Sequence, residues 1–128
     1  DVHKIPMEDN TFDVVICNHV LEHVDDSHKV MTEFYRVMKP GGWGIFQVPI
    51  DTNNPNTEED KSVTDPKERE RLYWQDDHLR LFGLDYGKKL AAAGFKVTES
   101  DFINELDSKL VKRYALPKGE IIYFCEKI

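Results

Sequence analysis

Apolar positions along the 128-residue chain alternate between short continuous runs and helical spacing. Residues 12–17 (FDVVIC) form a nearly continuous apolar run, which is typical of a strand covered on both faces. Residues 43–48 (WGIFQV) form a second such run. Between the two runs, five residues recur at helical spacing: Val30, Met31, Phe34, Val37 and Met38. This order predicts a parallel strand–helix–strand unit with a right-handed connection, and therefore an α/β fold.

The ends of the first helix carry their own signals. Asp25, Asp26 and Ser27 offer capping oxygens at its start, and Pro40-Gly41-Gly42 is expected to stop it. Tyr35 and Trp43 should join Phe34 in the core.

A polar stretch follows the second strand. Residues 51–61 contain no aliphatic side chain, which indicates a mobile surface loop, and Asp65-Pro66 predicts the start of a short helix that reaches Trp74. We interpret residues 51–76 as an insertion or lid over one end of the sheet, with a solvated surface helix as the alternative. Four elements should complete the chain: a helix at 84–93 ended by Gly94, a strand at 95–99, a short helix with Ile103, Leu106 and Leu110, and a strand at 120–126.

Composition excludes several classes of function. A net charge of −7 argues against a nucleic-acid partner, which needs clustered Lys and Arg. No apolar run approaches the roughly 20 residues that span a bilayer, so no membrane segment is expected. Cys17 and Cys125 both fall in predicted strands, which indicates reduced thiols in a cytoplasmic protein.

Three motifs, taken together, resemble the class I S-adenosylmethionine-dependent methyltransferases, and most closely the type 11 group. They are residues 1–15 (DVHKIPMEDNTFDVV), Leu21-Glu22-His23-Val24 and Lys39-Pro40-Gly41-Gly42. The resemblance implies a partial doubly wound, Rossmann-like sheet with strands 4-5-7-6 of that family, the last strand in the chain being antiparallel. It also implies methyl transfer to a small-molecule acceptor, with S-adenosylmethionine as cofactor of the complete protein.

The chain departs from the family in one respect. The glycine-rich loop after strand 1 and the acidic residue that ends strand 2 do not occur in residues 1–128. We therefore interpret these residues as the carboxyl-terminal portion of a methyltransferase domain, one that binds the cofactor poorly alone because close backbone approach needs glycine. A non-catalytic, truncated binding or dimerisation module is the alternative.

The resemblance assigns cofactor contacts to four residues. Asp1 matches the acidic residue that accepts a hydrogen bond from the adenine amino group, and Val2 offers its backbone N–H to the ring. Asn18 and His19 follow the first strand at the carboxyl edge of the sheet, where ligands of open α/β sheets bind. A frayed terminus for Asp1 and a surface histidine for His19 are the alternatives.

The acceptor pocket is assigned to the region after the polar stretch. Tyr73, Trp74 and Arg80 are candidate substrate-binding residues. Equally, they could be packing residues of the short helix that reaches Trp74. His19 and His78 are the candidate catalytic bases, needed only where the acceptor must lose a proton.

Residues 19–23 (HVLEH) also match the H-x-x-E-H motif of inverted zinc proteases. That motif requires both histidines one turn apart on a helix, whereas His19 comes directly after a strand. We therefore expect no metal here, and expect Glu22 and His23 to hold the loop through hydrogen bonds.

One partner is expected besides the small-molecule acceptor. The family's strand 1 would pair with residues 14–17, so that edge should be bare in this chain. A bare apolar edge invites pairing with another chain, and a homodimer through residues 14–17, or coverage by a terminal segment, is expected.

Overall fold

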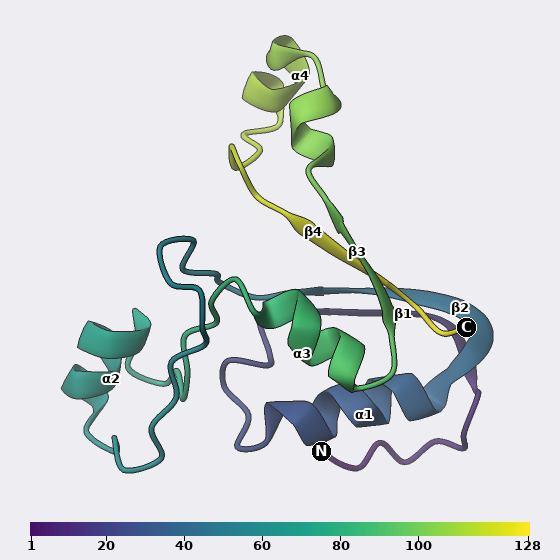
Figure 1. The fold of residues 1–128 in the computed structure, drawn as a ribbon, viewed down its shortest axis with the longest axis horizontal. Helices are drawn as coiled ribbons and strands as arrows, with labels where there is room; N and C mark the ends of the chain where they lie inside the picture. The colour runs from purple at the N-terminus through teal and green to yellow at the C-terminus, as the bar shows by residue number, and fades with distance from the viewer.

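The computed structural model describes all 128 residues and builds them around an open four-stranded sheet (Figure 1). The elements in chain order are β1 (Phe12–Asn18), α1 (Ser27–Val37), β2 (Met38–Gln47), α2 (Pro66–Tyr73), α3 (Tyr86–Ala92), β3 (Lys96–Ser100), the 3₁₀ helix η1 (Phe102–Glu105), α4 (Ser108–Arg113) and β4 (Ile122–Glu126). No helix is both long enough and apolar enough to cross a membrane.

The sheet has the strand order β1-β2-β4-β3. β1 pairs in parallel with β2, and β4 runs antiparallel to both of its neighbours. Translated into family numbering, this order is 4-5-7-6 with an antiparallel strand 7. The predicted fold class is therefore confirmed.

Local signals fix the start of α1 better than its end. The Asp26 carboxylate accepts a hydrogen bond from the Lys29 backbone N–H at 2.9 Å, as the capping pattern predicts. The helix ends at Val37, and Met38 is already extended and opens β2. The Pro40-Gly41-Gly42 segment therefore lies inside the strand, and the expectation that it stops the helix was wrong.

The core lies between one face of the sheet and the two helices α1 and α3, which Figure 1 shows on the same side. Phe34 of α1 stacks on Phe46 of β2 with ring centroids 5.1 Å apart. Tyr86 of α3 is fully buried and donates a hydrogen bond from its hydroxyl to the Phe46 carbonyl at 2.8 Å. These contacts attach both helices to the middle of β2.

The other face of the sheet is largely open, which corrects two predictions. Val14 is 40% exposed and Ile16 is 61% exposed, so β1 is not covered on both faces. Trp43 lies on this same face, stacked on Phe124 with centroids 5.5 Å apart, and does not join the core cluster. The physical reason is that α1 and α3 pack on one side only, and strand side chains alternate between faces.

The polar insertion packs beyond the carboxyl ends of β1 and β2 (Figure 1). Asp65 caps α2 by accepting from the Glu68 N–H at 3.0 Å, as predicted. Isolated bridges join Ile50 to Phe82 and Glu58 to Leu81. The loop is thus tied to the segment that leads into α3.

The hairpin at the far end of the chain differs slightly from its prediction. The expected single helix around Ile103 and Leu110 is divided into η1 and α4, because Leu106 between them is extended. Both lie at the distal end of the β3–β4 pair, away from α1 and α2 (Figure 1).

Candidate functional site

The carboxyl ends of β1 and β2 meet where the sequence places Asn18 and His19. The His19 N–H donates to the Gln47 carbonyl at 2.8 Å, and the Asn18 side-chain oxygen accepts from the Gln47 N–H at 3.3 Å. His19 has a φ of 56°, in the left-handed region that residues other than glycine visit uncommonly. Backbone strain of this kind concentrates at functional sites, because surrounding contacts must hold it in place.

His19 lines a pocket of about 310 Å³ at this edge. Gln47 forms one wall, and its side chain accepts from the Tyr123 N–H and donates to the Ile121 carbonyl, both at 2.9 Å. Ile50 and Leu84 supply apolar lining. The pocket thus combines apolar walls with a few fixed polar groups, which is typical of a small-molecule site.

The buried thiols and phenols near this edge stay protonated at neutral pH. Burial raises the pKa of Cys17 to about 11 and that of Tyr123 to about 12. Imidazole, by contrast, is the side chain whose charge normally changes near neutrality. The role of His19 as a catalytic base stays a prediction.

His78, the second candidate base, lies elsewhere, in a buried cluster with Glu22 and His23. The donor atoms of these three side chains all lie within 4.8 Å of one another. His78 Nδ1 lies 2.7 Å from the Tyr73 carbonyl, and the His78 and His23 rings meet edge to face with centroids 4.7 Å apart. The side chain of His78 is buried and does not line the His19 pocket.

Glu22 departs from its prediction. Neither carboxylate oxygen accepts a hydrogen bond, although the residue is 1% exposed. Its backbone carbonyl accepts from the Leu79 N–H at 2.9 Å, and His19 Nδ1 lies 3.4 Å from its Oε1. Its carboxylate lies beside the imidazoles of His23 and His78. Sequence reasoning missed this cluster because His78 is brought to Glu22 only by the path of the insertion.

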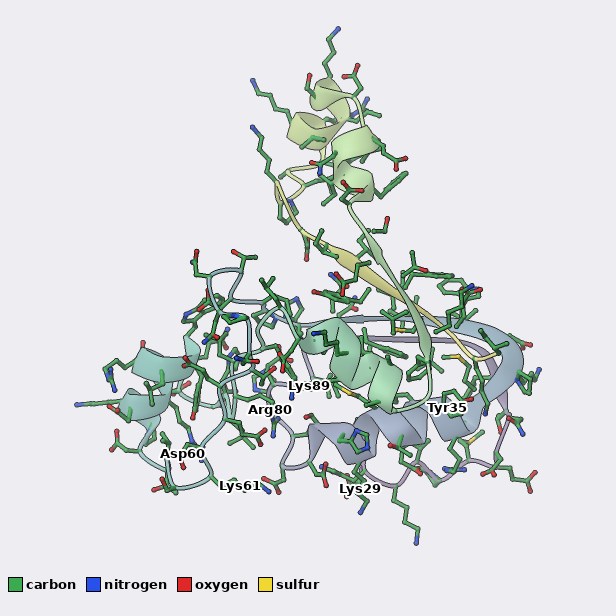
Figure 2. The ribbon with its side chains drawn as sticks, in the orientation of Figure 1. Lys29, Tyr35, Asp60, Lys61, Arg80 and Lys89 are labelled. Atoms are coloured by element: carbon green, nitrogen blue, oxygen red, sulfur yellow. The ribbon has the colours of Figure 1, made fainter.

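The three candidate acceptor residues point in different directions. Tyr73 is buried and its hydroxyl accepts from the Asp60 N–H at 3.0 Å, whereas Trp74 is half-exposed at the end of α2. Arg80 is buried between the insertion and the body of the molecule (Figure 2). None of the three lines the His19 pocket, and their roles in substrate binding stay predictions.

Arg80 instead fastens the loop between β1 and α1. Its guanidinium donates to the carbonyls of Leu21 and Val24, both at 2.6 Å, and to Asp25 at 3.1 Å. Glu59 of the insertion accepts from it at 2.8 Å. One buried side chain thus holds the loop that carries Glu22 and His23 against the insertion.

Asp1 and Val2 also lie outside the pocket. The Asp1 carboxylate accepts from the His3 N–H at 2.9 Å, and the His3 ring reaches the Asp26 N–H at 3.4 Å. The amino-terminal segment is therefore placed against the loop before α1. The cofactor contacts proposed for Asp1 and Val2 stay predictions.

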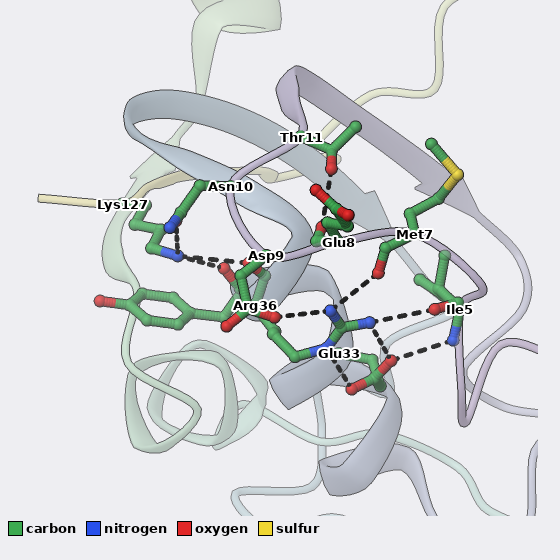
Figure 3. Close-up of polar contacts among 10 residues, drawn as sticks. Ile5, Met7, Glu8, Asp9, Asn10, Thr11, Glu33, Arg36 and Lys127 are labelled. Atoms are coloured by element: carbon green, nitrogen blue, oxygen red, sulfur yellow. Dashed lines mark hydrogen bonds and ion pairs between the residues drawn. The ribbon is translucent and has the colours of Figure 1, made fainter.

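Arg36 of α1 fixes the rest of that segment (Figure 3). It donates to the carbonyls of Ile5 and Met7 and to the Asp9 carboxylate, at 2.8 to 3.0 Å. Glu33 bonds both to Arg36 and to the Ile5 N–H. Side-chain hydrogen bonding to Arg36 lowers the pKa of Glu33 to about 2.

Part of the chain is similar in sequence to known methyltransferases. Residues 1–46 match the methyltransferase domain family. A 55-residue stretch is 50% identical to the ubiquinone/menaquinone biosynthesis C-methyltransferase of Desulfotalea psychrophila, covering 43% of this chain and 21% of that protein. The matched stretch thus spans about a fifth of that relative, and the resemblance of residues 1–46 to a methyltransferase domain is confirmed.

Solved structures agree on the fold. The 1,6-didemethyltoxoflavin-N1-methyltransferase of Burkholderia thailandensis, solved with bound 1,6-didemethyltoxoflavin and S-adenosylhomocysteine, superposes with a TM-score of 0.62 at 14% identity, covering 98% of this chain and 48% of that one. The cyclase SpnF superposes with a TM-score of 0.64 at 17% identity, covering 99% and 54%. Because one of these two is named as a cyclase, the fold alone does not fix the reaction.

Proposed function

We propose that this chain forms the carboxyl-terminal portion of an S-adenosylmethionine-dependent methyltransferase domain that acts on a small molecule. The observation that supports this most is the pocket at the carboxyl edge of β1 and β2, beside a strained His19. Ligands of open α/β sheets bind at that edge. The match of residues 1–46 to the methyltransferase domain family adds the reaction type.

The residues present fit only one end of the cofactor. Asn18 and His19 lie at the edge where its methionine part is expected, whereas Asp1 does not line the pocket and no glycine-rich loop occurs in the sequence. When bound, S-adenosylmethionine supplies an activated methyl group on a sulfonium. The remaining contacts, and tight binding, should need a glycine-rich segment in addition to residues 1–128.

The chain's own part in the reaction is orientation and proton removal. Gln47 and Tyr123 fix one wall of the pocket, and Ile50 and Leu84 add apolar surface to it. Holding the acceptor in line with the methyl group supplies much of the acceleration in such a displacement. Where the acceptor bears a proton, the His19 imidazole is placed to take it.

Titration with S-adenosylhomocysteine tests the proposal. We expect no tight binding to this chain alone and clear binding once it is joined to an upstream segment with the glycine-rich loop. The variant His19→Gly, which suits a φ of 56°, should then lower methyl transfer while the fold is retained. Ala115→Gly is the matched control, since Ala115 has a φ of 50° and lies outside the pocket.

The bare edge of β1 supports a second candidate, a non-catalytic dimerisation module. Val14 and Ile16 are exposed and β1 has β2 as its one neighbour. Under this candidate the extended chain still binds no S-adenosylhomocysteine, which separates the two functions. In either case we propose that residues 14–17 pair with a further strand, as a homodimer where no other segment covers them.

We also place the protein in the cytoplasm, on the support of its cysteines. Cys17 and Cys125 are free thiols in the sheet, and burial raises the pKa of Cys125 to about 12. Such thiols suit a reducing compartment.

A further inference from the structure

The cluster of Glu22, His23 and His78 contains buried polar atoms that form no hydrogen bond. Both Glu22 oxygens and His78 Nε2 are buried without a hydrogen-bond partner, and both residues are only 1% exposed. Buried polar atoms are nearly always paired, so each exception calls for a physical explanation. The protein has four such side-chain atoms; three belong to Glu22 and His78, which lie in one group of donors with His23, and the fourth is Arg80 Nε.

Each histidine is oriented from behind. His78 Nδ1 lies 2.7 Å from the Tyr73 carbonyl, and His23 Nδ1 lies 3.3 Å from the Asp77 carboxylate. Both partners are acceptors, so each Nδ1 is placed to donate, and a neutral imidazole in that orientation presents the lone pair of its Nε2. His23 Nε2 lies 3.9 Å from Glu22 Oε1. An imidazole that donates one N–H to a carbonyl or carboxylate while its other nitrogen is free has the usual arrangement of a metal ligand.

We propose that Glu22, His23 and His78 bind a divalent transition-metal ion of the zinc type. Two imidazoles and one carboxylate are a donor set suited to Zn²⁺, and unsuited to Mg²⁺, which prefers oxygen ligands. Donor atoms around tetrahedral zinc lie about 3.4 Å apart, given bonds of about 2.1 Å. The donors here lie within 4.8 Å of one another, so small side-chain rotations bring them together.

His19 offers a fourth donor. Its Nδ1 lies 3.4 Å from Glu22 Oε1, and its side chain is open to solvent. The sequence argument against a metal rested on the geometry of His19 and His23 along one helix. In the structure the second histidine of the site is His78, a buried residue from the segment after α2.

The surrounding backbone is fixed before any ion binds. The Leu79 N–H donates to the Glu22 carbonyl at 2.9 Å, which joins the two segments that carry the ligands. Arg80 holds Leu21 and Val24 on either side of the Glu22–His23 pair, both at 2.6 Å. This inference does not depend on methyl transfer, because the ligands are separate from the acceptor pocket except for His19.

Zinc titration of the full chain, in competition with a chromophoric chelator, tests the site. We expect one equivalent of Zn²⁺ to bind and Mg²⁺ not to compete. Asp77→Asn, at an exposed position, should weaken zinc binding by about 10- to 100-fold, since it removes the partner that orients His23. His23→Gln should weaken it at least as much. His28→Gln, which removes an exposed histidine of α1, is the matched control and should bind as the parent chain does.

A thermal-melting experiment separates a metal site from a structural cluster. Without metal, Glu22→Gln should melt at or above the temperature of the parent chain, because it removes a buried carboxylate that accepts no hydrogen bond. Added Zn²⁺ should raise the melting temperature of the parent chain and leave that of Glu22→Gln unchanged. The proposal is overturned if the parent chain binds no zinc, if Asp77→Asn and His23→Gln both bind it normally, or if Zn²⁺ stabilises both proteins equally.

Discussion

Arg80 shows how a single buried side chain can hold a functional loop. Its guanidinium meets three carbonyls of the loop before α1 and the Glu59 carboxylate at once. A lysine ammonium has three donors on a flexible stem and cannot reproduce this planar fork. We expect Arg80→Lys to lower the free energy of unfolding by about 2–4 kcal/mol, since charged hydrogen bonds contribute about 1.5–3 kcal/mol each and only some are lost.

Urea denaturation measures this loss. Arg71→Lys is the control, because Arg71 lies on the exposed part of α2 and bonds only to Glu68 of the same helix. Equal stability of the two variants would contradict the role given to Arg80.

Glu33 gives the protein a defined acid sensitivity. Its pKa is about 2 in the folded chain, against an ordinary value near 4.5, mainly because Arg36 hydrogen-bonds to the ionised form. A lowered pKa contributes stability that is fully present above about 4.5 and is lost as the pH falls toward 2. We expect Glu33→Gln to cost about 1–2 kcal/mol at pH 7, after allowance for solvent screening, and less at pH 2.

Unfolding curves between pH 2 and 7 provide the measurement. Glu70→Gln, at an exposed position of α2, should leave the pH dependence unchanged. If the free energy of unfolding of Glu33→Gln falls at acid pH as much as that of the parent chain, the Arg36 contact does not stabilise the fold.

At this scale the sequence predicts what is local. Asp26 and Asp65 cap their helices as expected, because a cap depends on residues within one turn. The position of His19 at the sheet edge also follows from its place after a strand. The pairing of His78 with Glu22 depends on how the insertion returns to the body, and no local pattern carries that information.

At the scale of elements, Gly83 permits the insertion to approach the segment before α3. A Cβ atom at Gly83 would lie 2.5 Å from the Asn56 carbonyl carbon, a distance that requires the backbone to move. Gly83→Ala should therefore lower the free energy of unfolding by about 1–3 kcal/mol and loosen the contact between the insertion and the body.

Hydrogen exchange locates that effect. The Glu58 and Leu81 amides, which bond to each other's carbonyls across the bridge, should exchange faster in Gly83→Ala. Lys88→Ala, at an exposed site on α3, is the control. Unchanged protection of both amides would show that the insertion is held by other contacts.

The strands were predicted correctly in existence but not in exposure. An unbroken apolar run such as FDVVIC predicts cover on both faces, yet Val14 and Ile16 are exposed in this chain. The apolar run indicates that the strand is suited to burial on both faces. Whether its side chains are exposed depends on which helices of the chain pack on the sheet. The same reasoning explains why Trp43 lies outside the core.

At the scale of the whole molecule, the order of the sheet was predictable only through the family resemblance. Hydrophobic periodicity gives the parallel β1–β2 unit, but nothing in it states that β4 inserts between β2 and β3. The pairing of β4 with β2 joins residues distant in sequence, and Gln47 stabilises this pairing by hydrogen bonds to the backbone of Ile121 and Tyr123. The resemblance supplied this long-range pairing.

The open edge and open face of β1 lead to a prediction about association. Phe12, Val14 and Ile16 form one apolar face next to an unpaired strand edge. We expect the parent chain to self-associate as its concentration rises, and Ile16→Lys to remain monomeric. Ile16 is 61% exposed, so this change should alter the stability of the monomer by no more than about 0.5 kcal/mol.

Sedimentation velocity over a range of concentrations tests this association. Thr98→Lys is the matched control, because Thr98 is exposed on β3, the strand at the opposite edge of the sheet. If Thr98→Lys lowers self-association as much as Ile16→Lys does, the effect comes from net charge and not from the β1 edge. A parent chain that stays monomeric at every concentration would contradict the prediction. The charged side chain of Asp13 in β1 would then be enough to keep other strands from pairing with this edge.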